Sequence, residues 1–312
     1  MQFKYNNLFL NKLTIFGIIF YLFICFKFMK INKINKIKVC ICTIGKLENL
    51  YIREYISHYI KYGVDKIFIF DNNDLNGERF ENVINDYIEN SFVEIINYRG
   101  VKQPQLKAYQ QCLNFNYNKY NWIIFYDIDE FIFLKNFSNV KNYLNQERFY
   151  KCQSIQLNMV FHNDNELLYY DNRTLFERFN KTKKSNKVAA LKTILKGNIK
   201  TKITCVHNIN NKLKSCNGFG ELNHKEKFAI YTKKPDNKFY YIDHFCFKST
   251  EEFINKLNNR GSSLYGKTNE GKLKKIGWYF SVNKITSKKI DYLEKYIKVN
   301  LTKYRNKISI IH

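Results

Sequence analysis

The sequence is poor in residues and motifs that mark several common classes of protein. Its 312 residues include only 2 prolines and 12 glycines, and its 8 cysteines form no C-x-x-C pair and no zinc-finger spacing. No G-x-G-x-x-G follows the first predicted strand, and no arginine-rich arm or RNP-like aromatic signature is present. These absences argue against a zinc finger and against a Rossmann phosphate loop for a dinucleotide. The chain also lacks a motif that recognises nucleic acid, so we expect no nucleic-acid partner.

Positive charge is the strongest bias of the composition, with a formal net charge of +25 at pH 7. The lysines are spread through nearly every segment of a chain that is also rich in Asn, Ile, Tyr and Phe. We therefore interpret most of them as a solvated surface, which would still favour a phosphorylated ligand or the headgroups of a bilayer. A hydrophobic fraction of 45% with 17% aromatics excludes general disorder. The length suits one α/β domain with elaborations or two small domains.

The cysteines do not define a disulfide framework. Cys40 and Cys42 alternate along a predicted strand and face the same side, so they are unsuited to pair with each other. We interpret most of the eight as small buried apolar residues. Cys205 and Cys216 would close a short loop in an oxidising compartment, and the sequence leaves this pairing open.

A long apolar run near the amino terminus predicts a membrane anchor. Residues 13–29 are almost uniformly apolar, approach the roughly 20 residues that span a bilayer, and are followed by no small-residue cleavage site. We predict a tail over 1–12, a single-pass anchor over 13–30 and a short linker over 31–37. A buried terminal helix or a cleaved signal is the alternative. More lysines follow the run than precede it, which favours a cytoplasmic body, but lysine is abundant throughout and the side of the membrane stays open.

Strands and helices alternate in the first part of the body. The hydrophobic pattern predicts strands at 37–43, 66–70, 93–98 and 122–126, separated by helices at 47–62, 78–90 and 105–115. Continuous apolar strands joined in this way indicate a parallel sheet with right-handed crossovers. Ligands of such sheets bind at the carboxyl ends of the strands, where Thr43, Asp71 and Asp127 lie. We therefore predict an α/β fold with a mostly parallel sheet flanked by helices.

The apolar run at 122–126 ends abruptly in Asp127-Ile128-Asp129-Glu130. If the run is a buried strand, Asp127 and Asp129 emerge together at its carboxyl end while Ile128 points back into the core. Two neighbouring carboxylates repel each other, and a hard divalent cation with open positions for phosphate oxygens would neutralise them. The pattern predicts a site for a metal and a phosphorylated ligand. A polar strand end without a ligand is the alternative.

Beyond residue 135 the pattern is less regular. It predicts helices near 140–147 and 250–259, and strands near 154–161, 189–195 and 240–247. A basic amphipathic pattern over 287–307 predicts one long helix, which we interpret as packing on the core rather than lying on a membrane.

Short blocks between residues 38 and 261 follow one another in a specific order. They are Cys42-Thr43 with Glu48 to Tyr55, Phe70-Asp71-Asn72, Gln105 with Ala108-Tyr109, Asp127 to Phe131, Leu168 to Phe179, and Ile242 to Phe245 with Lys248-Ser249, Glu251 to Phe253, Lys256 and Arg260-Gly261. In this order and spacing the chain resembles GT-A glycosyltransferases of the family 2-like and family 92-like kind. His244-Phe245 stands where the family commonly has His-Tyr, which is a mild departure.

The resemblance implies a Rossmann-like GT-A catalytic domain over 38–261 and a C-terminal helical extension over 262–312. It implies a nucleotide-sugar donor, a glycan, glycolipid or glycoprotein acceptor, and Mn²⁺ or Mg²⁺ as cofactor. The implied metal ligands are Asp127, Asp129 and His244. The implied donor-binding residues are Thr43, Asp71, Gln105, Asp127 and Lys248.

Inverting transfer also needs a carboxylate that takes the proton of the acceptor hydroxyl. The candidates are Asp164, Asp171, Glu221 and Glu130, with Asp164 preferred. A nucleotidyltransferase and a basic module that binds nucleic acid or membrane are the alternative functions. The first lacks the Gly-Ser pair expected ahead of its carboxylates, since Gly100 is followed by Val101. The second explains the charge but not the block that begins at His244.

Overall fold

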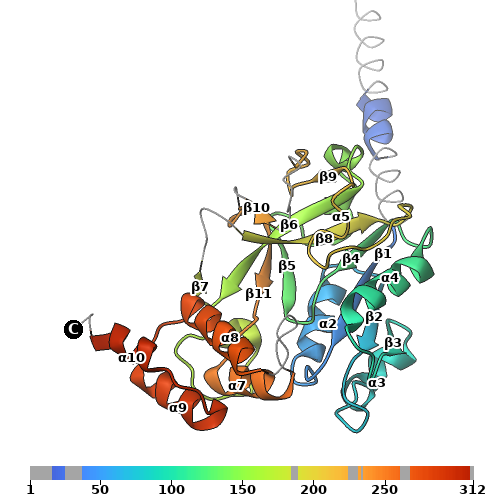
Figure 1. Ribbon diagram of the computed structural model, residues 1–312. Helices are drawn as coiled ribbons and strands as arrows, with labels where there is room; N and C mark the ends of the chain where they lie inside the picture. Colours follow the sequence, from blue (N-terminus) through green and yellow to red (C-terminus); the bar gives the residue numbers. More distant parts are fainter. Residues whose placement is uncertain are drawn as a thin grey trace, which may run out of the picture.

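The computed structural model describes residues 16–24, 37–183, 189–223, 231–232, 235–260 and 268–309. Its first half is a set of parallel strands in the order β3-β2-β1-β4, drawn on the right of Figure 1. The strands are β1 (Val39–Gly45), β2 (Lys66–Asp71), β3 (Val93–Asn97) and β4 (Trp122–Phe125). The connecting helices are α2 (Ile52–Lys61), α3 (Glu81–Glu89) and α4 (Pro104–Asn116). This is the predicted alternation, in the strand order of a doubly wound sheet.

The burial of these strands explains their continuous apolar sequence. Every residue of β1 and of β4 is buried, as expected for parallel strands covered on both faces. Helix α2 buries Ile52, Tyr55, Ile56 and Tyr59, which recur at helical spacing on one side of the helix. The α/β fold predicted from the pattern is confirmed.

The second half of the sheet corrects the expectation of a mostly parallel arrangement. It continues from β4 in the order β8-β6-β11-β5, and β8 runs antiparallel to both β4 and β6. Strand β11 is parallel to β6 and antiparallel to β5. The sheet is therefore mixed, because β8 enters between β4 and β6 in the opposite direction. These strands are β5 (Glu130–Leu134), β6 (Ser154–His162), β8 (Ala189–Lys196) and β11 (Tyr240–His244).

Shorter elements complete this half. They are α5 (Val140–Leu144), the 3₁₀ turn η1 (Glu147–Phe149), α6 (Leu175–Arg178), β7 (Thr182–Lys183), β9 (Ser215–Cys216) and β10 (Tyr231–Thr232). Strand β5 was not predicted, because it begins at Glu130, the last residue of the acidic run, where no apolar pattern marks the start of a strand.

The C-terminal helices form a group at the lower left of Figure 1. They are α7 (Thr250–Asn259), α8 (Asn269–Val282), α9 (Ser287–Ile297) and α10 (Thr302–Ser309). The single helix predicted over 287–307 is wrong in its length, because Lys298 adopts a left-handed φ of 56° and ends α9. The predicted packing on a core is confirmed, since Ile290, Leu293 and Ile297 are buried together with residues of α7 and α8. Helix α8 was not predicted.

The predicted membrane anchor is only partly described. Residues 16–24 are helical with exposed side chains. Within the described part of the chain, no helix is long and apolar enough to cross a membrane. The remaining residues of the predicted anchor, 13–15 and 25–30, lie outside that part.

Two disulfide bonds correct the interpretation of the cysteines. Cys42 of β1 is bonded to Cys112 of α4, and Cys152 is bonded to Cys216 of β9. The pairing considered between Cys205 and Cys216 is wrong, because Cys216 has a different partner and Cys205 is free. The bonded cysteines are remote in sequence, so no local spacing identified them.

Candidate active site

The acidic run lies at the carboxyl end of β4, as the sequence predicted, but the chain turns within it. The β4 strand ends at Phe125, and the backbone N–H of Glu130 donates to the carbonyl oxygen of Asp127 at 3.1 Å. Ile128 is only 2% exposed and packs in the core, as expected. Because of the turn, the carboxylates of Asp127 and Asp129 have different partners.

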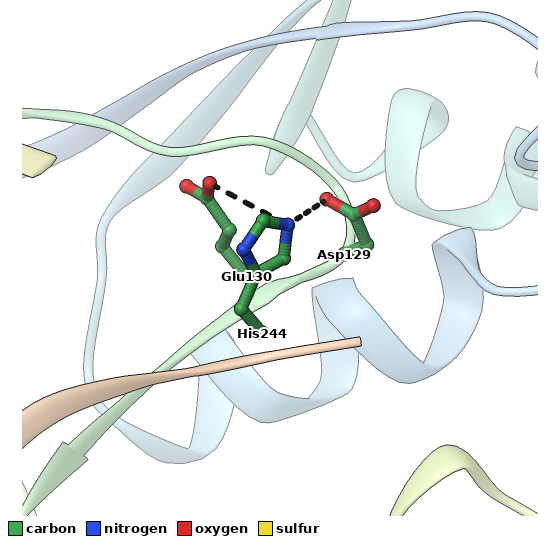
Figure 2. Close-up of side chains that lie close together, drawn as sticks. All are labelled: Asp129, Glu130 and His244. Atoms are coloured by element: carbon green, nitrogen blue, oxygen red, sulfur yellow. Dashed lines mark ion pairs between the residues drawn. The ribbon is translucent and has the colours of Figure 1, made fainter. Parts of the chain in front are cut away.

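Asp129, Glu130 and His244 form a buried cluster, shown in Figure 2. The Nε2 atom of His244 lies 3.5 Å from Oδ1 of Asp129 and 4.0 Å from Oε1 of Glu130. Antiparallel pairing of β11 with β5 sets His244 opposite Glu130, which brings the imidazole to the acidic turn. One ligand atom from each residue lies within 4.8 Å of the others, a spacing that can enclose a metal ion. Asp127 is not part of this cluster.

Two lysines balance the carboxylates of the site. Lys192 of β8 is 1% exposed, and its Nζ lies 2.8 Å from Oδ2 of Asp127 and 3.2 Å from Oε2 of Glu130. Lys256 of α7 donates to Oδ2 of Asp129 at 3.0 Å. The sequence assigned neither lysine to the site. Lys256 belongs to the last block of the family resemblance but had no role there, and nothing marks Lys192 among 52 basic residues. Their elements meet the acidic turn only in the folded chain.

Burial and neighbouring charges give Asp127, Asp129 and Glu130 different pKa values. Burial opposes ionisation of Asp129, but Lys256 and His244 bring its pKa well below the usual value. Burial likewise opposes ionisation of Asp127, and Lys192 outweighs it to lower that pKa. Burial dominates at Glu130 and raises its pKa to about 7 despite Lys192. The cluster therefore combines ionised Asp129 with a carboxyl group that a bound cation would ionise.

Two buried polar atoms of the cluster are unsatisfied. Oε1 of Glu130 and Nδ1 of His244 have no hydrogen-bond partner among the described residues. Carboxylate oxygens suit Mg²⁺ and Mn²⁺, and an imidazole nitrogen is compatible with a transition metal. The free Oε1, together with Oδ1 of Asp129 and Nε2 of His244, fits a small divalent cation.

Asp127 faces the amino-terminal part of α4. Its Oδ1 accepts hydrogen bonds from Nε2 of Gln105 and from the hydroxyl of Tyr109, both at 2.9 Å. Gln105 is half-buried, so this edge of the site is partly open. The predicted donor-binding residues Gln105 and Asp127 are thus brought together.

The other predicted donor-binding residues are buried, and Asp71 and Lys248 form internal ion pairs. Asp71 is 2% exposed and pairs with Arg99, whose Nη2 lies 2.6 Å from Oδ2. Thr43 is fully buried in β1. The Nζ atom of Lys248 lies 2.9 Å from Oε2 of Glu48 and does not contact the acidic cluster directly.

Asp164 lies in a separate polar contact between the sheet and the C-terminal helices. It is 1% exposed, and its Oδ2 lies 2.6 Å from Nζ of Lys289. The hydroxyl of Tyr279 donates to the same oxygen, and the amide of Asn283 accepts from the Asp164 backbone at 2.7 Å. All of these partners belong to α8, α9 and the segment between them, not to the acidic turn.

A comparison with known families decides the classification. The sequence profile of glycosyltransferase family 92 matches residues 35–299. The chain belongs to glycosyltransferase family 92. The resemblance drawn from the ordered motifs is confirmed. The match passes residue 261 and ends at residue 299, so α7, α8 and α9 are part of the family 92 region.

Curated family 92 proteins of plants match a shorter part of the chain. A relative from Oryza sativa subsp. japonica is 29% identical over 104 residues, which are 30% of this chain and 16% of the relative. One from Ricinus communis is 27% identical over 109 residues, 34% of this chain and 19% of the relative. These matches span less than a fifth of each relative.

Solved structures of S. aureus TarS residues 1–349 are more distantly similar. One has a TM-score of 0.38 and 11% identity, and covers 78% of this chain and 72% of that chain. A complex of the same protein with UDP-GlcNAc has a TM-score of 0.38 and 10% identity, with coverages of 83% and 82%. Similarity at this level supports no conclusion about the ligand of this family 92 protein.

Proposed function

We propose that this protein is a metal-dependent glycosyltransferase that moves a sugar from a nucleotide-diphosphate donor to a glycan, glycolipid or glycoprotein acceptor. Membership in family 92 supports the reaction class. The observation that carries the metal dependence is the meeting of Asp129, Glu130 and His244 at the carboxyl end of β4. This is the edge of an α/β sheet where ligands bind.

The protein groups at this site can neutralise a leaving diphosphate. Mn²⁺ or Mg²⁺ held by Asp129, Glu130 and His244 would supply a Lewis acid for the charge that develops as the glycosidic bond breaks. Lys256 lies beside Asp129 and is partly exposed, which places a second positive charge where the diphosphate would enter. Lys192 forms ion pairs with both Asp127 and Glu130 and so fixes the positions of the two carboxylates.

If transfer is inverting, a general base must take the proton from the hydroxyl of the sugar acceptor. Glu130 is fully buried and paired with Lys192, so we assign it to cation binding rather than to this step. Asp164 would serve only if its carboxylate left Lys289 and Tyr279. Inversion and the identity of the base remain proposals that rest on the family.

We also propose that residues 13–30 anchor the protein in a membrane with the body on its oxidising side. The apolar sequence supports the anchor. The disulfides Cys42–Cys112 and Cys152–Cys216 support this side, because such bonds persist in oxidising compartments. This is opposite to the side favoured by the lysines that follow the apolar run.

A screen of nucleotide-sugars for Mn²⁺- and Mg²⁺-dependent turnover tests the function. We expect the parent protein to release nucleotide diphosphate from one donor. Asp129→Asn should lose at least about 10²-fold in rate while its circular dichroism spectrum shows an intact fold. Asp86→Asn is the matched control, because Asp86 pairs with Arg53 on the surface of α2 and α3. Equal rates for the parent and Asp129→Asn would overturn the proposal.

A further inference from the structure

A row of aromatic rings leads from the acidic cluster to helix α8. The ring of His244 lies 5.2 Å from that of Phe161, and the ring of Phe161 lies 5.8 Å from that of Trp278. The ring of Phe247 also packs against Trp278, with the ring centres 4.6 Å apart. Phe161 and Trp278 are only half-buried, so part of this aromatic surface faces solvent. Because Phe161 separates Trp278 from His244, the surface lies beside the proposed cation site and not within it.

Lys275 lies over this aromatic surface. It precedes Trp278 by three residues on α8, and its Nζ is 4.8 Å from the centre of the Trp278 ring. No carboxylate among the described residues forms an ion pair with Lys275, whereas its neighbour Lys274 pairs with Glu270 at 2.6 Å. The lysine is half-buried rather than free in solvent.

The surroundings of Lys275 favour an added negative charge. Burial lowers its pKa, and the positive charge of Lys256 on α7 lowers it further. Asp129 acts in the opposite direction, but its carboxylate already pairs with Lys256. A half-buried cation beside another cation is unfavourable unless an anion binds between them or next to them.

We propose that Trp278 and Lys275 form a subsite for an acceptor sugar that carries an anionic group. The apolar face of a sugar ring packs on an aromatic ring, and a carboxylate or phosphate on that sugar would accept a charge-assisted hydrogen bond from Lys275. This inference rests on the proposed glycosyltransferase function and adds the chemical class of the acceptor. It also gives α8 a role in substrate recognition.

Tryptophan fluorescence tests the subsite without turnover. The chain has only 2 tryptophans, and Trp122 is buried in β4, so a Trp122→Phe variant reports Trp278 alone. The full chain is titrated with glucuronate, glucose 6-phosphate, glucose and inorganic pyrophosphate. We expect one or both anionic sugars to change the fluorescence at concentrations where glucose and pyrophosphate do not. Lys275→Gln should weaken that binding roughly tenfold or more, and Lys274→Gln should leave it unchanged.

Several results would overturn the subsite. These are equal binding of glucose and the anionic sugars, binding of pyrophosphate as tight as that of the sugars, and equal losses for Lys275→Gln and Lys274→Gln. If Trp122→Phe does not fold, protection of Lys275 from reductive methylation by the same ligands replaces the fluorescence. A failed donor screen with intact binding of anionic sugars would reject the transferase and retain the subsite, which separates the two failures.

Discussion

The Nε2 atom of His244 lies 3.5 Å from Oδ1 of Asp129, although Asp129 belongs to the turn between β4 and β5 and His244 is the last residue of β11. The register of β11 against β5 creates this contact by pairing His244 with Glu130. The imidazole completes an oxygen and nitrogen donor set that the acidic turn alone lacks. The relationship gives a direct test of cation binding.

Substitution of His244 should weaken cation binding. We expect His244→Ala to raise the dissociation constant for Mn²⁺ by about tenfold or more, measured by calorimetry, since one of three donors is lost. His207→Ala is the control, because His207 bonds to the carbonyl of Leu191 outside the cluster. Chelation should abolish turnover, and added Mn²⁺ or Mg²⁺ should restore it. Full activity in a chelator would show that Lys192 and Lys256 suffice without a metal.

Loss of Lys192 should destabilise the fold as well as the site. Lys192→Met leaves the half-buried carboxylate of Asp127 and the buried carboxylate of Glu130 without their cation. We expect a loss of roughly 3 kcal/mol in the free energy of unfolding. Lys196→Met on the same strand should change it by much less, because Lys196 is the half-buried last residue of β8 and its Nζ bonds to the carbonyl of Tyr150 rather than to a carboxylate. Adding Glu130→Gln to Lys192→Met should recover part of the loss. Denaturant curves that coincide for both single variants would contradict this account.

The two disulfides should be detectable in the isolated protein. Mass mapping without reduction should give the pairs Cys42–Cys112 and Cys152–Cys216, with Cys205 open to alkylation. Cys152→Ala should lower the free energy of unfolding by roughly 2–5 kcal/mol, and Cys205→Ala should change it little. Alkylation of all seven of the cysteines at 40 and beyond would reject both bonds and the proposed side of the membrane.

Acid should destabilise the protein in part through His58. Burial lowers the pKa of His58 to about 4, and its Nε2 lies 3.0 Å from the carbonyl oxygen of Ile132. In the unfolded chain the pKa is near the ordinary 6.5, so the unfolded state binds the extra proton first. The contribution of neutral His58 to the free energy of unfolding is complete above pH 6.5. It falls by about 1.4 kcal/mol per pH unit as the pH drops toward 4.

Urea denaturation at several pH values measures this contribution. His58→Gln keeps an N–H donor but cannot titrate, so its stability should fall less steeply than that of the parent between pH 6.5 and 4. Parallel curves for the two proteins would mean that His58 titrates in the folded state as it does in the unfolded chain.

The sequence by itself determined the parallel first half of the sheet, the position of the acidic run and the family. Fully buried strands need apolar residues at every position, and this pattern is local, so it can be recognised without a structure. Ile128 is buried as predicted, although it lies in the turn after β4 rather than in a strand.

The tertiary structure decided which side chains share the site. Because the chain turns after β4, Asp127 contacts Gln105 and Lys192. Asp129 lies instead beside Glu130 and His244. Contacts between residues remote in sequence determine three further features. These are the position of β8 between β4 and β6, the pairing of β11 with β5, and the disulfide partners. Such contacts follow from strand register and packing, which no local pattern specifies. The sequence therefore predicted acidic residues at the end of a strand, and only the tertiary structure determined the turn and the partners of each carboxylate.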